Sequence, residues 1–149
     1  MSDYRWHSPD PQTQAEFYAD VPMKRFIAWI VDTFLILSVS AVIVVMTALT
    51  GLLILPAIML VVGFVYRVAT ISRYSATWGM RLTAIEFRTL AGNRFESSMA
   101  VTHTFGYSVC LVLPFFQIIS IIMMLTSQRG QGLPDTFLGT IAVNRQAAR

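Results

Sequence analysis

The sequence predicts a small, mainly α-helical integral membrane protein. Of its 149 residues, 55% are hydrophobic and only 13% are charged, whereas soluble domains usually carry about 25% charged residues. Two apolar regions, residues 22–71 and 99–127, are long enough to enter a bilayer. We expect a two-helix transmembrane hairpin, a small cytoplasmic β unit, then a Pro-broken helical hairpin or a third transmembrane helix, and a short C-terminal strand.

The polar N-terminal segment is predicted to be an uncleaved cytoplasmic tail. It lacks the early apolar region that a secretory signal peptide needs. Asp20, placed just before Pro22, is typical of a helix N-cap followed by proline in the first turn. The predicted organisation is a tail over residues 1–21, a membrane domain over residues 22–143 and a C-terminal tail over residues 144–149.

The first apolar region is predicted to form two spans. From Thr33 to Tyr66 the chain has no charge, and this run of about 34 residues would be roughly 50 Å long as one helix. A bilayer core of about 30 Å needs only about 20 residues. Gly51 and Pro56 lie near the middle of the run and favour a turn at about residues 47–53. We therefore expect helices over about residues 22–47 and 53–72.

Asp32 lies inside the predicted first span, where a carboxylate is costly unless it has a partner. Arg25 stands two helical turns earlier on nearly the same face, about 10 Å away along the axis. Ala28 lies between them and is small enough to let a neighbouring segment approach closely. Two interpretations follow. In the first, which we favour, Arg25 is an anchor at the membrane interface and Asp32 fixes helix packing. In the second, Asp32 binds or relays a cation.

The polar stretch between the apolar regions is predicted to be cytoplasmic. Four arginines outnumber two glutamates there, and a basic excess marks the cytoplasmic side of a membrane protein. Residues 82–87 read as a strand, Gly92-Asn93 as a turn with a short second strand after it, and a helix begins near Glu96. The C-terminal residues 140–143 also read as a strand. We expect the two strands to pair, which requires both to lie on one side of the membrane.

The second apolar region, residues 99–127, is interrupted by Pro114. It is long enough for one kinked span or for two half-helices. The cations that follow it, Arg129, Arg145 and Arg149, are opposed only by Asp135, so the C-terminus is also expected in the cytoplasm. A re-entrant or interfacial hairpin that turns near Pro114 is therefore favoured, rather than a third full span.

Catalytic and metal-binding patterns are missing from the sequence. A single cysteine, Cys110, allows no intrachain disulfide and offers no metal-ligand spacing. His103 is distant in sequence from any carboxylate or second histidine, so we predict a packed or interfacial histidine. The net charge of +3 is explained by arginines that flank the apolar spans rather than by nucleic-acid binding. We predict a protein that is not an enzyme and has no metal and no cofactor.

Three segments together resemble the RDD family of bacterial membrane proteins, which is named for one arginine and two aspartates. Residues 24–32, KRFIAWIVD, resemble the first signature of the family, and residues 75–86 resemble the stretch after its second helix. Residues 128–140 resemble the closing signature, in which an aspartate precedes Gly-Thr and a short strand. The resemblance covers about residues 22–143. It implies that Arg25, Asp32 and Asp135 are the family's polar residues, and we expect them to form one cluster at the cytoplasmic boundary.

The resemblance implies no enzyme activity, although cation–proton exchange has been suggested for some family members. Two functions stay open. The favoured one is a non-catalytic accessory or scaffold protein that contacts a larger membrane complex, or itself as a homo-oligomer. The alternative is a small cation/proton antiporter that works as an oligomer with Asp32 as its ion or proton site. In either case we expect a multi-pass protein of the bacterial cytoplasmic (inner) membrane, with the lipid bilayer as a partner and both termini in the cytoplasm.

Overall fold

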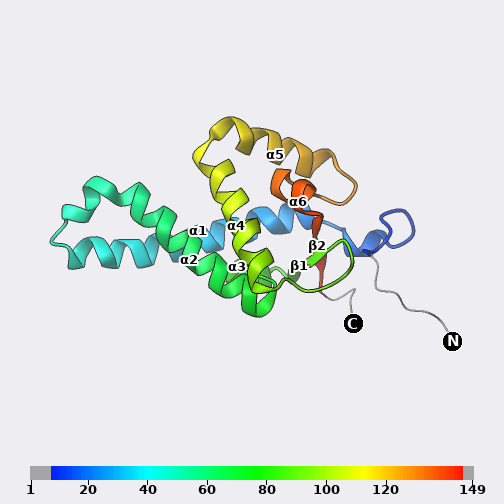
Figure 1. Ribbon diagram of the computed structural model, residues 1–149, viewed down its shortest axis with the longest axis horizontal. Helices are drawn as coiled ribbons and strands as arrows, with labels where there is room; N and C mark the ends of the chain where they lie inside the picture. The colour runs from blue at the N-terminus through cyan, green and yellow to red at the C-terminus, as the bar shows by residue number, and fades with distance from the viewer. Residues whose placement is uncertain (1–7, 146–149) are drawn as a thin grey trace.

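The computed structural model describes residues 8–145 and is mainly helical (Figure 1). A long hairpin of two helices carries a two-stranded sheet and a second, bent helix pair at one end. The elements in order are η1 Ala15–Phe17, α1 Val21–Met46, η2 Thr50–Ile54, α2 Leu55–Tyr74, α3 Trp78–Leu82, β1 Ile85–Thr89, α4 Ser97–Val112, α5 Pro114–Thr126, α6 Leu133–Leu138 and β2 Thr140–Asn144. The predicted mainly helical membrane architecture is confirmed at this level.

The hairpin of α1 and α2 is made of two helices that are long and apolar enough to cross a membrane. Its large side chains are widely exposed, with 70% of Phe34 and 89% of Leu53 accessible, as expected for a lipid-facing surface. The turn lies where predicted, but Gly51 does not supply its positive φ angles. Ala48 and Leu49 adopt them, at 52° and 68°. Gly51 instead allows close packing, because a Cβ there would lie 2.7 Å from Thr47 Oγ1.

The two strands pair antiparallel, with Glu86 opposite Val143 and Phe87 opposite Ala142. The predicted pairing is confirmed, although the first strand begins at Ile85 because Leu82 ends α3. The second short strand expected after the turn is reduced to a single bridge between Arg88 and Arg94. This sheet brings the segment after α2 and the end of the described chain to one end of the hairpin (Figure 1).

The described part of the N-terminal tail packs on the sheet. The Asn144 side-chain amide donates to the carbonyls of Glu16 and Ala19, at 2.8 and 2.9 Å. The Ser8 N–H donates to the carbonyl of Leu90. Asp20 precedes α1 as predicted, but it does not cap the helix with its side chain. Its backbone is left-handed, with φ at 58°, and its carbonyl rather than its carboxylate accepts the Lys24 N–H.

Helices α4 and α5 form a second helical hairpin, bent by 115° at a break next to Pro114. The pair starts just after the bridge at Arg94 and returns to α6 and β2, so both of its ends lie near the sheet (Figure 1). The Leu133 N–H donates to Ser120 Oγ at 2.9 Å and ties α6 to α5. The buried core lies at this same end, where α1, α2, α3, α4 and the sheet meet: Val21, Ala28, Ile71, Ala76, Met80, Ile85, Phe87, Phe95, Ala100 and Ala142.

Candidate functional site

Asp135, at the start of α6, is fully buried and paired with Arg25 of α1. Arg25 Nη1 lies 2.6 Å from Asp135 Oδ2 and also donates to the Gly130 carbonyl at 3.2 Å. The guanidinium lies over the ring of Phe87, 5.4 Å from its centroid. A buried charge needs such a partner and further hydrogen bonds to be tolerated. The pair therefore joins α6 to the N-terminal part of α1.

Three more donors complete the Asp135 carboxylate. Thr140 Oγ1 donates to Oδ1 at 3.0 Å, the Gly132 N–H donates to Oδ2 at 3.1 Å, and His103 Nε2 lies 2.7 Å from Oδ1. Because an ionised carboxylate only accepts hydrogen bonds, His103 Nε2 carries the proton. Burial alone would raise the pKa of the Asp135 carboxyl, but the Arg25 charge and the His103 hydrogen bond hold it well below its usual range. Asp135 is therefore ionised at neutral pH.

His103 has a structural partner that sequence reasoning missed. The sequence places His103 far from any carboxylate, yet it contacts Asp135 across 32 positions of sequence. Its ring also packs 4.6 Å from the ring of Phe87 and 5.5 Å from that of Phe95. The prediction of a packed histidine holds, but the prediction of its isolation is wrong. The contact exists because β2 and α6 return beside α4, which no local spacing in the sequence records.

Asp32 is buried in a second cluster that joins α1 to α2 and α3. Its Oδ1 accepts the Tyr66 hydroxyl at 2.6 Å and the Gly79 N–H at 2.9 Å. Its Oδ2 accepts the Thr77 hydroxyl at 2.6 Å. The nearest cation is Arg67, whose Nη1 lies 3.9 Å from Oδ2. Neutral donors thus hold the Asp32 carboxylate at hydrogen-bond distance, while its cation stands farther away.

The approach of α3 to α1 makes the Asp32 cluster possible. A Cβ on Gly79 would lie 2.2 Å from the carbonyl oxygen of Ala28, so only glycine fits there. The small Ala28 was predicted to admit a close neighbour, and that neighbour is α3. Thr77 caps α3 by accepting the Met80 N–H at 3.2 Å while its hydroxyl proton goes to Asp32.

The structure brings two of the three expected residues together and leaves the third apart. Arg25 binds Asp135, and no ion pair joins Arg25 to Asp32 among residues 8–145. The single cluster that we expected is therefore two hydrogen-bonded groups. The reason is tertiary, because the return of α6 to the start of α1 gives Arg25 a closer carboxylate than the one two turns along its own helix.

Other long-range contacts were also invisible in the sequence. Lys24 Nζ donates to Asn144 Oδ1 at 2.7 Å. Lys24 and its neighbour Arg25 therefore both bind the C-terminal segment. No role is predicted for Tyr66 or Thr77 from the sequence. Their one available signal is that both polar side chains flank the end of an apolar run that contains an aspartate.

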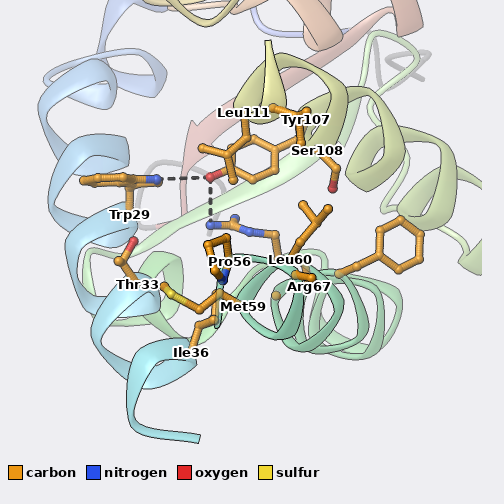
Figure 2. Close-up of a pocket in the computed structure, with 14 residues that line it drawn as sticks. Trp29, Thr33, Ile36, Pro56, Met59, Leu60, Arg67, Tyr107, Ser108 and Leu111 are labelled. Atoms are coloured by element: carbon orange, nitrogen blue, oxygen red, sulfur yellow. Dashed lines mark hydrogen bonds between the residues drawn. The ribbon is translucent and has the colours of Figure 1, made fainter. Parts of the chain in front are cut away.

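Two cavities adjoin these groups. The larger, of about 890 Å³, is lined by residues that include Arg25, Asp32, Arg67 and His103. The smaller, of about 490 Å³, lies between α1, α2 and α4 and shares Arg67 with the larger one (Figure 2). Within the described part of the chain, no group of three or more His, Cys, Asp or Glu side chains could hold a metal ion.

Comparison with known proteins gives one assignment. The model of the RDD family matches residues 19–139, which is most of the chain. A search of curated proteins and a search of solved structures each gave no significant match.

Proposed function

The chain belongs to the RDD family. Because its two buried carboxylates are hydrogen-bonded within the chain, we propose that it is a non-catalytic accessory or scaffold membrane protein. In this proposal it is not an enzyme. It acts through its helices and its sheet end, which contact a larger membrane complex or other copies of the same chain. The RDD polar residues then serve to hold the two halves of the domain together.

The observation that carries this proposal is the complete use of both carboxylates within the chain. Each oxygen of Asp32 and each oxygen of Asp135 accepts at least one hydrogen bond from the protein. A carboxylate that serves as a catalytic base or ion ligand needs an oxygen directed at the substrate or ion. Here the oxygens are directed at the elements that they join.

The hairpin offers the surface for membrane contacts. In the most apolar 18-residue stretch of each of its two helices, only 22% and 6% is buried within the chain. Side chains such as Phe34, Val45 and Leu53 expose 67% or more of their surface. Lipid covers such a surface well, and so does an apolar helix of another membrane protein.

The same proposal places the protein in the cytoplasmic membrane of a bacterium, with both ends in the cytoplasm. The pairing of β1 with β2 supports one side of the membrane for the segment after α2 and for the C-terminal segment, because β1 follows α2 and β2 ends the described chain. It also supports a re-entrant or interfacial α4–α5 hairpin. A reporter that is active only outside the cytoplasm, fused after Arg149, should stay silent. Strong activity would establish a third full span and end the hairpin proposal.

The function is tested by reconstituting the full chain in liposomes and recording proton flux when a gradient of Na⁺ or K⁺ is applied. A scaffold should give the same flux as protein-free liposomes. Native mass spectrometry of the detergent-extracted protein should in turn show defined oligomers or a co-purifying membrane complex. Cation-dependent proton exchange above the protein-free level, by a monomer or by an oligomer, would contradict the proposal.

One observation favours the alternative, a small cation/proton antiporter with Asp32 as its ion or proton site. Asp32 and Arg67 line the larger cavity, and so does Thr104, whose buried hydroxyl has no hydrogen-bond partner among the described residues. For this function, Asp32→Asn should leave a folded protein that has lost a cation-dependent flux shown by the parent. For the scaffold, Asp32→Asn should change stability only.

A further inference from the structure

The smaller cavity has an apolar wall and a polar end. Ile36 of α1, Leu60 and Phe64 of α2, and Leu111 of α4 contribute to its wall, and Arg67 and Tyr107 stand together at one part of it (Figure 2). Concave, mostly apolar sites with a few converging polar groups are the usual form of ligand sites. The polar end therefore decides which ligand would fit.

The Tyr107 hydroxyl has a proton that no hydrogen bond within the described residues uses. Its hydroxyl oxygen accepts the Trp29 indole N–H at 3.1 Å and Arg67 Nη2 at 3.3 Å, shown as dashed lines in Figure 2. A hydroxyl has two acceptor lone pairs and one donor, so these two contacts use its acceptor capacity. Among residues 8–145, the Tyr107 hydroxyl accepts these two hydrogen bonds and donates none. A ligand oxygen would satisfy it.

Arg67 has donors to spare beside that hydroxyl. Its side chain is 12% exposed, and its guanidinium lies 4.2 Å from the centroid of the Tyr107 ring. The described polar contacts of Arg67 are the Tyr107 hydroxyl and the Asp32 carboxylate at 3.9 Å. A guanidinium carries five N–H donors, and Asp32 is already held by three neutral donors. Arg67 and Tyr107 together therefore present unused donors and a positive charge to an apolar cavity.

The depth of Arg67 fits a lipid headgroup. Beyond Asp32, α1 continues without charge from Thr33 to Met46, which is about 21 Å of helix. A hydrocarbon core is about 30 Å thick, so Arg67 lies near the edge of the core once the turn is included. Trp29 and Tyr107 at the same level are the residue types that collect at membrane interfaces. A phosphate at that edge is within reach of an arginine side chain.

We propose that this cavity binds an anionic phospholipid. The phosphate oxygens accept from the Arg67 guanidinium and the Tyr107 hydroxyl, and an acyl chain lies along the apolar wall toward Ala57. Basic pockets between membrane helices bind anionic headgroups in this way. The site adds a ligand to the proposed scaffold and does not depend on that function.

The test is native mass spectrometry of the detergent-purified full chain, titrated with palmitoyl-oleoyl phosphatidylglycerol or with phosphatidylcholine of the same acyl chains. The parent should bind phosphatidylglycerol more tightly. Arg67→Gln should weaken that binding about tenfold, the effect of one charged hydrogen-bonding group. The matched control is Arg73→Gln, which removes an exposed cation from the same helix and should change affinity by less than about twofold.

Two further variants keep the test decisive if Arg67→Gln does not fold. Tyr107→Phe removes only the hydroxyl and should weaken phosphatidylglycerol binding about threefold to fivefold. Ala57→Phe fills the far end of the cavity and should weaken binding of the full lipid but not of glycerol phosphate. Equal losses in Arg67→Gln and Arg73→Gln would mean surface attraction only and would overturn the proposal. So would unchanged affinity in folded Tyr107→Phe, equal binding of phosphatidylcholine, or equally tight binding of oleate or inorganic phosphate.

Discussion

Asp32 and Asp135 are both buried, with 1% and 0% of their surface exposed, but they have different partners. Asp135 is 2.6 Å from a guanidinium, whereas the Asp32 carboxylate is 3.9 Å from one and accepts its short hydrogen bonds from neutral groups. Asp135 joins α6 and β2 to α1 and α4, and Asp32 joins α1 to α2 and α3. The comparison teaches that two family aspartates can share burial and yet depend on charge to different degrees.

Removing the cation from the Asp135 group should produce the largest effect. Arg25→Gln leaves a buried carboxylate without its counter-charge, and breaking a buried pair costs about 3–5 kcal/mol. The free energy of unfolding in mixed micelles should fall by that amount. Arg73→Gln, an exposed cation of the hairpin, serves as control and should stay within about 0.5 kcal/mol of the parent. A loss below about 1 kcal/mol in Arg25→Gln would mean that Asp135 does not depend on charge.

Blocking the approach that creates the Asp32 group should come next. Gly79→Ala places a Cβ 2.2 Å from the Ala28 carbonyl oxygen, and such overpacking costs about 1–3 kcal/mol. Gly106→Ala is the matched control, because its Cβ would meet Pro134 at an ordinary 3.5 Å. That change should be neutral or stabilising, by up to about 1 kcal/mol of helix propensity. Thermal unfolding in detergent separates the two, and equal melting temperatures would show that α3 can move away at little cost.

Neutralising Asp32 should have a smaller effect than neutralising Asp135. In Asp32→Asn an oxygen still accepts from Tyr66 and Gly79, and the new amide must face the Thr77 hydroxyl, which can reorient. We expect a loss of about 1–2 kcal/mol, compared with about 3–5 kcal/mol when the carboxylate of an ion pair is removed in Asp135→Asn. Unfolding titrations of the two variants measured side by side check the order. The reverse order would show that Arg67 contributes more than its 3.9 Å distance indicates.

The smallest expected effect is the pH dependence of the Asp135 group. The folded pKa of Asp135 lies below its unfolded value of about 3.9. Its contribution is therefore fully present above about pH 4 and is lost as the pH falls toward the folded pKa. The stability difference between the parent and Asp135→Asn should shrink by about 1 kcal/mol between pH 6 and pH 3. A difference that grows on acidification would contradict the sign of the shift.

Much of the fold could be predicted because local signals carried it. The charge-free run set the hairpin, Pro114 set the break, and the strand patterns with one-sided arginines set the pairing of β1 and β2. Arg25 and Asp32 stood out from their place in the first apolar run, and the resemblance added Asp135 to them. Their grouping could not be predicted in this way, because the contacts of Asp135 with Arg25 and His103 span 110 and 32 positions of sequence. Helical spacing suggested Asp32 as the partner of Arg25. In the folded chain α6 lies beside α1, and its Asp135 binds Arg25 instead.

The central claim is that Arg25 belongs with Asp135 and not with Asp32, and a pair of double-mutant cycles tests it most directly. The free energies of unfolding are measured for Arg25→Gln, Asp135→Asn, Asp32→Asn and the two doubles that contain Arg25→Gln. The account predicts a coupling energy of about 2–3 kcal/mol between Arg25 and Asp135, with the double recovering part of the loss, and additivity within about 0.5 kcal/mol for Arg25 and Asp32. Strong coupling of Arg25 to Asp32 with additivity toward Asp135 would contradict it.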